Sequence, residues 1–312
     1  INNNQKMKGK LKIGHVLGII IFISTILRLF GLDHESLWAD EIYSINLIKK
    51  SFTDLIITTA NDVHPPLYYI LLKFWVAIFG DTIAIVRGLS ALLGIISILI
   101  LSKVAKTIFD EKTALVSIIL ISISTFHLFY SQETRMYSLL FLLTIISIWY
   151  QFKTFILHEK TIKNLASYLI STLLLLYTHS YGVFIIVFQN IFVFGFCFFL
   201  YHDRKSILKR WLISQTILFL LFLPWIIITL QQYNAMGGGN FWIGPVSPRN
   251  IYDTFLKFAN NSRYILLISL FCLIFSLLKW RPVGNSFFSN HYFGKGLYSL
   301  PNGFKLETAH LF

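Results

Sequence analysis

Carboxylates gather in one short stretch of this chain, where their spacing could support acid–base chemistry. Of the 14 Asp and Glu residues, six lie between positions 33 and 62: Asp33, Glu35, Asp40, Glu41, Asp54 and Asp62. Asp40 and Glu41 directly precede the helix-like run IYSINLIKK, near the positive end of its dipole. Asp40 could cap that helix or take part in catalysis. The sequence leaves both roles open.

Further polar side chains stand out in three other places. His64 precedes two prolines in NDVHPPLYY, a stiffened turn that drives it toward extended geometry, and its role could be structural or chemical. Glu133 and Arg135 in YSQETRMYSL lie next to apolar runs, where ionisable groups are costly and often functional. Arg135 could pair with a carboxylate or bind a phosphate through its planar fork, and Arg87 has the same two options. His179 lies in YTHSYG, together with Tyr181.

The elements that must position these residues are membrane helices. Hydrophobic residues make up 55% of the chain, charged residues only 13%, and the mean hydropathy is +0.67. Soluble domains carry about 25% charged residues. A helix needs ~20 mostly apolar residues to cross the hydrocarbon core, and several stretches meet that length. The composition therefore predicts an all-α polytopic membrane protein.

The net charge of +13 could indicate nucleic-acid binding or cytoplasmic loops, and its distribution favours the loops. The basic residues fall in clusters between apolar spans, with no continuous basic face. These clusters are Lys6–Lys12, Lys103–Lys112, Lys153–Lys163 and Arg204–Arg210. The cysteines, Cys197 and Cys272, lie inside apolar spans and indicate neither a disulfide framework nor a metal site.

Keeping the basic clusters on the cytoplasmic side predicts about eight membrane-spanning helices and a cytoplasmic N-terminus. The expected spans are residues 13–31, 85–103, 113–130, 137–152, 164–178, 182–201, 211–230 and 264–279. The first is expected to be retained as a helix rather than removed as a signal peptide. Residues 32–84 and 231–263 become extracytoplasmic loops. Residues 66–79 are apolar but short, so they are expected to lie along the outer membrane surface.

This topology places every unusual polar group on the extracytoplasmic side. It divides the chain into a transmembrane domain over residues 1–280 and a polar tail over residues 281–312. Neither GxxxxGKS nor GxGxxG occurs, so the sequence gives no signature for a nucleotide phosphate. A site that uses a lipid-borne substrate outside the cytosol fits this arrangement.

The order and spacing of four motifs resemble a known superfamily. The four motifs are DE in SLWADEIYS, HPPL and FGD…R in HPPLYYILLKFWVAIFGDTIAIVRG, and QETRMY in YSQETRMYSLL. Together they resemble the membrane glycosyltransferases of the protein O-mannosyltransferase and lipid-A aminoarabinose transferase superfamily, especially the branch of Rgt-type lipopolysaccharide glycosyltransferases. The resemblance covers residues 13–230 and is strongest over 31–140. It implies a GT-C-like fold whose long first extracytoplasmic loop carries interfacial helices.

The resemblance also implies an activity, namely transfer of a sugar from a polyprenyl-phosphate carrier to a glycan, lipid or protein hydroxyl. Asp40 then corresponds to the catalytic base, and Glu41 to its supporting neighbour. The expected donor-phosphate and substrate-binding residues are His64, Arg87, Glu133, Arg135, Tyr137 and His179. Such transfer needs a base for the acceptor hydroxyl and cationic groups for the leaving phosphate.

Two departures from the family's pattern affect these expectations. Related oligosaccharyltransferases hold a divalent cation with an Asp-x-Asp pair in the second outer loop, whereas SQETR offers only Glu133. The expectation is therefore that no cofactor is required and that no residue is assigned as a metal ligand; the sequence leaves a divalent cation open but does not support one. Family members usually continue with more helices, so an incomplete C-terminal end is expected. The expected location is the plasma membrane of a bacterium or archaeon.

A transporter or flippase for lipid-linked sugars is the alternative from another functional class. Such a protein would place polar residues near the bilayer midplane on broken helices, in repeated halves. Here the polar residues cluster at one face and no internal repeat is evident, which favours the enzyme.

Overall fold

The structure, a computed structural model, describes residues 3–157, 159, 161–199, 204–235 and 247–279. Within these ranges the regular elements are all helical. They are α1 (Asn3–Leu29), α2 (Ala39–Ile48), α3 (Phe52–Ala60), α4 (Leu67–Phe79), α5 (Ile83–Ile108), α6 (Glu111–Ile123), α7 (Thr125–Ser131), α8 (Tyr137–Gln151), the π-helical turn η1 (Phe152–Ile156), α9 (Ile162–Leu176), α10 (Gly182–Phe199), α11 (Arg204–Ala235), α12 (Pro248–Phe258) and α13 (Arg263–Lys279). The polar tail predicted for residues 281–312 lies outside the described residues.

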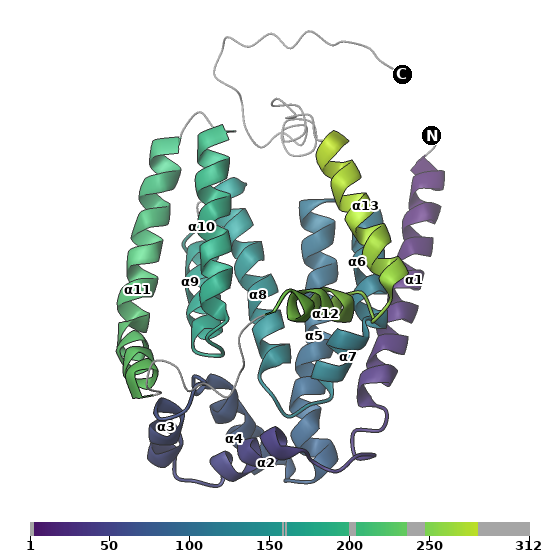
Figure 1. Cartoon of the computed structure of the whole chain (residues 1–312). Helices are drawn as coiled ribbons and strands as arrows, with labels where there is room; N and C mark the ends of the chain where they lie inside the picture. Colours follow the sequence, from purple (N-terminus) through teal and green to yellow (C-terminus); the bar gives the residue numbers. More distant parts are fainter. Residues whose placement is uncertain (1–2, 158, 160, 200–203, 236–246, 280–312) are drawn as a thin grey trace.

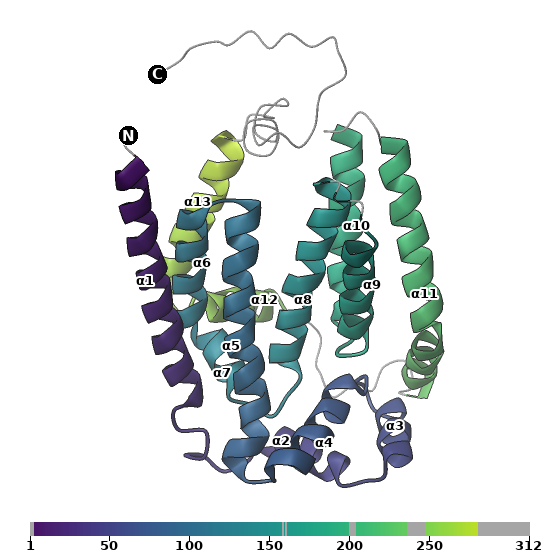
Figure 2. The ribbon, with the colours of Figure 1, turned by 180° about the vertical axis from the view of Figure 1, so that it is seen from behind.

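The long helices form an up-and-down bundle, and the short helices α2, α3 and α4 cover one end of it (Figure 1). Helix α1 runs from the N-terminal end of the bundle to that covered end, and α5 runs back. The view from behind shows the same arrangement (Figure 2). The end of α5, the start of α6 and the first turns of α9 and α11 carry basic residues of the predicted clusters. They lie at the end of the bundle where α1 begins, away from α2–α4.

Three helical stretches are long and apolar enough to cross a membrane by length and composition: Ile83–Ile108, Tyr137–Ile156 and Arg204–Asn234. The number rises to five if each of two bent helix pairs counts as one span. Helices α1, α9 and α10 contribute shorter apolar segments. The all-helical membrane fold is thus confirmed, while eight spans stays a prediction.

The expected span 113–130 is not one helix, because the chain bends by 64° between α6 and α7. Ser124 is extended at this break and its hydroxyl accepts a hydrogen bond from the His127 backbone N–H at 3.3 Å. The Asn260 side chain accepts from the Thr125 N–H (2.9 Å) and donates to the Ile123 carbonyl (3.2 Å). A helix can break at membrane depth when other groups take over its freed backbone partners, as here.

The second long loop expected over residues 231–263 is partly helical. Helix α11 continues to Ala235, and α12 occupies Pro248–Phe258. Ser247 caps α12, its hydroxyl accepting from the Asn250 N–H at 3.2 Å, and Pro248 takes the first helical position. This Ser–Pro start is a recognised helix signal. The GGGNFWIGP part of the loop lies outside the described residues.

Helix α4 anchors the covered end of the bundle to the long helices. Tyr68 and Tyr69 are fully buried in an apolar cluster with residues of α2, α5 and α8, whereas Phe74 and Ile78 are exposed. The two tyrosines therefore pack inside the protein, while another side of α4 carries exposed apolar side chains. The Tyr68 hydroxyl and Ser90 Oγ lie 2.8 Å apart. The α2–α4 layer is thus a packed part of the fold.

Candidate active site

Asp40 projects from the first turn of α2 and remains accessible. Its side chain is 47% exposed, while that of the next residue, Glu41, is fully buried. Trp38, not Asp40, occupies the N-cap position, and its backbone N–H donates to Glu41 Oε2 at 3.4 Å. The capping interpretation of Asp40 is therefore wrong. Its carboxylate is open to solvent.

Glu41 and Arg87 form a buried ion pair that fixes α2 on the bundle. Arg87 Nε and Nη2 donate to the two Glu41 oxygens at 2.9 and 2.7 Å. The same carboxylate accepts from the Thr134 backbone N–H at 2.9 Å. Burial disfavours its charged form, but these hydrogen bonds outweigh burial and lower the pKa of Glu41. The pair therefore joins three segments that are distant in the sequence.

All N–H groups of Arg87 have partners in this arrangement. Besides Glu41, the guanidinium donates to the backbone carbonyls of Leu32, Glu35 and Ser36 at 2.8–3.2 Å. A guanidinium has five N–H donors, and these contacts use them. The geometry thus favours a positioning role for Arg87 over the direct phosphate contact that the sequence suggested.

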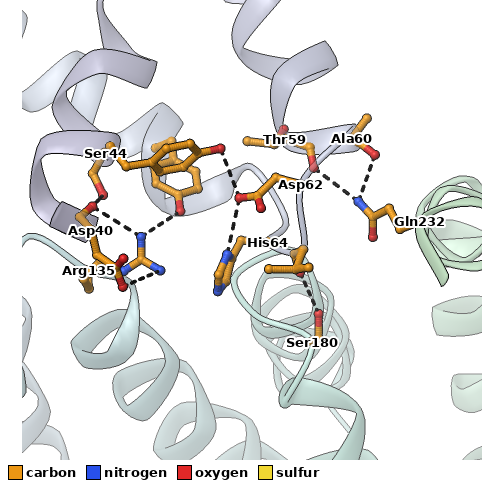
Figure 3. Close-up of polar contacts among 12 residues, drawn as sticks. Asp40, Ser44, Thr59, Ala60, Asp62, His64, Arg135, Ser180 and Gln232 are labelled. Carbon is orange, nitrogen blue, oxygen red and sulfur yellow. Dashed lines mark hydrogen bonds and ion pairs between the residues drawn. The ribbon is translucent and has the colours of Figure 1, made fainter. Parts of the chain in front are cut away.

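Arg135 supplies the cation beside Asp40. Its guanidinium is buried, yet Nη2 lies 3.7 Å from Asp40 Oδ2 (Figure 3). Nη1 donates to the Tyr69 hydroxyl at 3.3 Å, and Nε has no partner among the described residues. Arginine keeps its charge even when buried. The site therefore holds a fixed positive charge next to an accessible carboxylate.

Another carboxylate, Asp62, lies near His64. The sequence placed it in the acidic cluster but assigned it no role in the site. Asp62 Oδ2 accepts a hydrogen bond from the Tyr43 hydroxyl at 3.0 Å and lies 3.5 Å from His64 Nδ1 (Figure 3). Burial opposes the charged form of Asp62, but its hydrogen bonds, chiefly that with His64, lower its pKa. Two positions in the sequence indicate this hydrogen-bonded group. Asp62 lies two residues before His64, and Tyr43 lies one helical turn after Asp40.

His179 and Tyr137 complete this face of the bundle. The His179 ring lies 5.3 Å from that of His64, 5.8 Å from that of Tyr137 and 4.5 Å from that of Tyr181. Burial lowers the pKa of His179 to about 4, so its ring is neutral at pH 7. The Tyr181 backbone N–H donates to Nδ1 at 3.1 Å, so the proton of the neutral ring belongs on Nε2. His179 is thus a hydrogen-bond donor without charge.

Glu133 is also buried at this end of the bundle, in the segment between α7 and α8. The structure therefore gathers the sequence-predicted residues Asp40, Glu41, Arg87, Glu133 and Arg135 around the start of α2. It places His64, Tyr137 and His179 together beside Asp62. Among the described residues, no group of three or more His, Cys, Asp or Glu side chains could hold a metal ion. The role of each residue in binding or catalysis stays a prediction.

The fold and site define a class, that of helical integral membrane proteins with a polar site at one end of the bundle. Residues 63–228, more than half of the chain, match the dolichyl-phosphate-mannose-protein mannosyltransferase family, and the chain belongs to that family. The match includes His64, Arg87 and Arg135, whereas Asp40 and Glu41 precede it. The resemblance to GT-C membrane glycosyltransferases is thereby confirmed. Comparison with curated proteins gave no match.

A solved structure shares the fold. The archaeal oligosaccharyltransferase AglB from Archaeoglobus fulgidus, in complex with an inhibitory peptide and a dolichol-phosphate, superposes with a TM-score of 0.56 at 16% sequence identity. The similarity covers 88% of this chain but only 38% of AglB. This chain therefore spans well under half the length of AglB, within the same helical architecture.

Proposed function

We propose that this protein transfers a sugar from a polyprenyl-phosphate carrier to a hydroxyl acceptor, with Asp40 as the general base. The acceptor is a glycan, a lipid or a protein. One observation carries the proposal: the accessible Asp40 carboxylate lies 3.7 Å from the buried guanidinium of Arg135. A proton acceptor and a fixed cation side by side suit a reaction that removes a proton and releases an anion.

The reaction balances with the groups present. Asp40 takes the proton of the acceptor hydroxyl while the hydroxyl oxygen attacks the anomeric carbon of the sugar. The bond between that carbon and the phosphate oxygen breaks, and its electron pair leaves with the polyprenyl phosphate. Arg135 meets the phosphate as a cation, and neutral His179 can donate from Nε2. The leaving phosphate is a stable anion, so the reaction needs no strong general acid.

The distribution of charge supports an orientation in the membrane. Basic clusters lie at the N-terminal end of the bundle, and cytoplasmic ends of membrane proteins carry the excess of Lys and Arg. The site at the other end would then face the extracytoplasmic side, with the N-terminus in the cytoplasm. A polyprenyl-phosphate donor agrees with the dolichol-phosphate bound to AglB and with the name of the family.

Incubating membranes that contain the protein with a panel of radiolabelled polyprenyl-phosphate sugars tests this function. The expected result is release of at least one labelled sugar from its carrier onto an acceptor. Membranes without the protein are the control. Label that crosses the membrane while still attached to its carrier, with no transfer, would instead support the transporter or flippase.

A further inference from the structure

Glu133 has an unusual environment for a carboxyl group. Glu133 is only 6% exposed, and its Oε2 atom is buried without a hydrogen-bond partner among the described residues. Burying a carboxylate oxygen without a partner is costly, so native structures rarely leave one. This atom lies in the same cluster as Asp40 and Arg135. A ligand can supply the missing partner, and a proton on the carboxyl would remove its charge and make it a hydrogen-bond donor.

The surrounding charges favour the proton. Glu133 interacts electrostatically with charged and titratable groups from the elements around it. These groups are Asp40 and Glu41 of α2, Arg87 of α5, Tyr130 of α7, Arg135, and Tyr137 of α8. Arg87 is engaged with Glu41, and Arg135 is directed at Asp40 and Tyr69. Burial first, and then the negative charge of Glu41, raise the pKa of Glu133 to about 7. Arg135 and Arg87 oppose this rise, but neither forms an ion pair with Glu133 among the described residues.

We propose that Glu133 binds the phosphate of the lipid-linked donor as a neutral carboxylic acid, donating a hydrogen bond to a phosphate oxygen. This inference rests on the proposed function. With Glu133 neutral, the charges of Asp40 and Glu41 are balanced by those of Arg87 and Arg135. An ionised Glu133 would add an uncompensated negative charge beside an incoming anion. Donor binding should therefore be coupled to proton uptake by the site.

The donor itself makes this coupling measurable. A polyprenyl-phosphate sugar is a phosphodiester and lacks the second ionisation, near pH 6, that a phosphate monoester has. Any change of donor affinity between pH 6 and pH 9 consequently reports on the protein. If only the protonated form of Glu133 binds, the dissociation constant rises by up to about tenfold per pH unit above the pKa of this group.

The experiment measures binding of radiolabelled polyprenyl-phosphate mannose to the purified full chain at pH 6, 7, 8 and 9. We expect the affinity of the wild type to fall as the pH rises through 7. Glu133→Gln keeps a neutral donor of hydrogen bonds, so it should bind as the wild type does at pH 6 and show a flatter pH profile. Glu133→Ala removes the donor and should bind more weakly at every pH. Size-exclusion profiles establish that each variant is folded.

The experiment distinguishes failure of the proposal for Glu133 from failure of the proposed function. Groups other than Glu133 titrate in both the wild type and Glu133→Gln, so the difference between their pH profiles isolates this residue. Identical profiles, or loss of binding in folded Glu133→Gln at pH 6, would overturn the role of Glu133 while leaving the proposed function intact. If the mannose donor is not bound, the other polyprenyl-phosphate sugars of the panel are tested, and absence of binding of all of them by the wild type at every pH would overturn both.

Discussion

Replacing Arg87 by methionine should destabilise the protein strongly. The substitution removes both donors that pair with the fully buried Glu41 carboxylate, and it frees the loop carbonyls of Leu32, Glu35 and Ser36. Glu41 would keep only the backbone N–H groups of Trp38 and Thr134. A buried carboxylate without its cation is the costly outcome of this change.

The magnitude follows from the geometry of the pair. Breaking a buried ion pair by removing one partner costs about 3–5 kcal/mol. The freed carbonyls of the exposed residues Glu35 and Ser36 can bind water and add little, whereas that of buried Leu32 adds to the loss. Adding Glu41→Gln should recover part of the loss, because a neutral amide needs no counter-charge. Arg249→Met is the matched control: Arg249 is 88% exposed, 3.9 Å from Asp253, and such exposed pairs contribute at most about 1 kcal/mol.

Equilibrium denaturation in mixed micelles measures these differences in the free energy of unfolding. The pKa of Glu41 is lowered, so folded protein binds this proton more weakly than unfolded protein. The stabilisation is complete above the ordinary pKa of about 4.3 and is lost as the pH falls through the lower folded value. Arg87→Met should remove this acid-sensitive contribution. A loss no larger than that of Arg249→Met would refute the positioning role of the pair.

Three further predictions concern the donor, the topology and the helix packing. Arg135→Ala should weaken donor use by about 1.5–3 kcal/mol, with little effect on the acceptor, because it removes a charge-assisted phosphate contact; an unchanged donor affinity would exclude Arg135 from the phosphate site. A single cysteine at position 106, in a variant without the native cysteines, should resist a membrane-impermeant reagent added from outside, and strong labelling would invert the topology. Gly94→Ala should cost about 1–3 kcal/mol of stability, because its new methyl group would collide with the Ser131 side chain. Gly195→Ala, with nothing within 4 Å, is its control, and equal stability of the two variants would contradict the close packing of α5 on α7.

The sequence predicted the helices well because each span is a long apolar run with polar ends. Residues 137–152, for example, were expected as a helix, and α8 with η1 covers Tyr137–Ile156. The break at Ser124 was missed because nothing in the local sequence forces it. The bend is stabilised by Asn260 and by Arg28, whose Nη2 donates to the Ile121 carbonyl at 3.2 Å. Both partners are far away in the sequence.

The chemical character of the site was easier to predict than the partners within it. Asp40 and Glu41 are neighbours in the sequence, but the turn of α2 sends one to the surface and the other into the core. Arg87 could bind a carboxylate or a phosphate, and only the packed loop shows that its donors are engaged. The positions of Tyr43 and Asp62 in the sequence mark both as candidates, but their hydrogen bond depends on how α2 packs against α3.

Asp40→Asn tests the central claim most directly, through sugar transfer by membranes containing each variant. Asparagine keeps the size of the side chain and a hydrogen-bonding oxygen, but it does not accept the proton. General-base catalysis contributes about 10²–10⁴-fold in rate. We predict that transfer falls by at least this order while the protein inserts and folds normally. Asp33→Asn, a change in the same loop, should remain active. Full transfer activity in folded Asp40→Asn would contradict the assignment of Asp40 as the base.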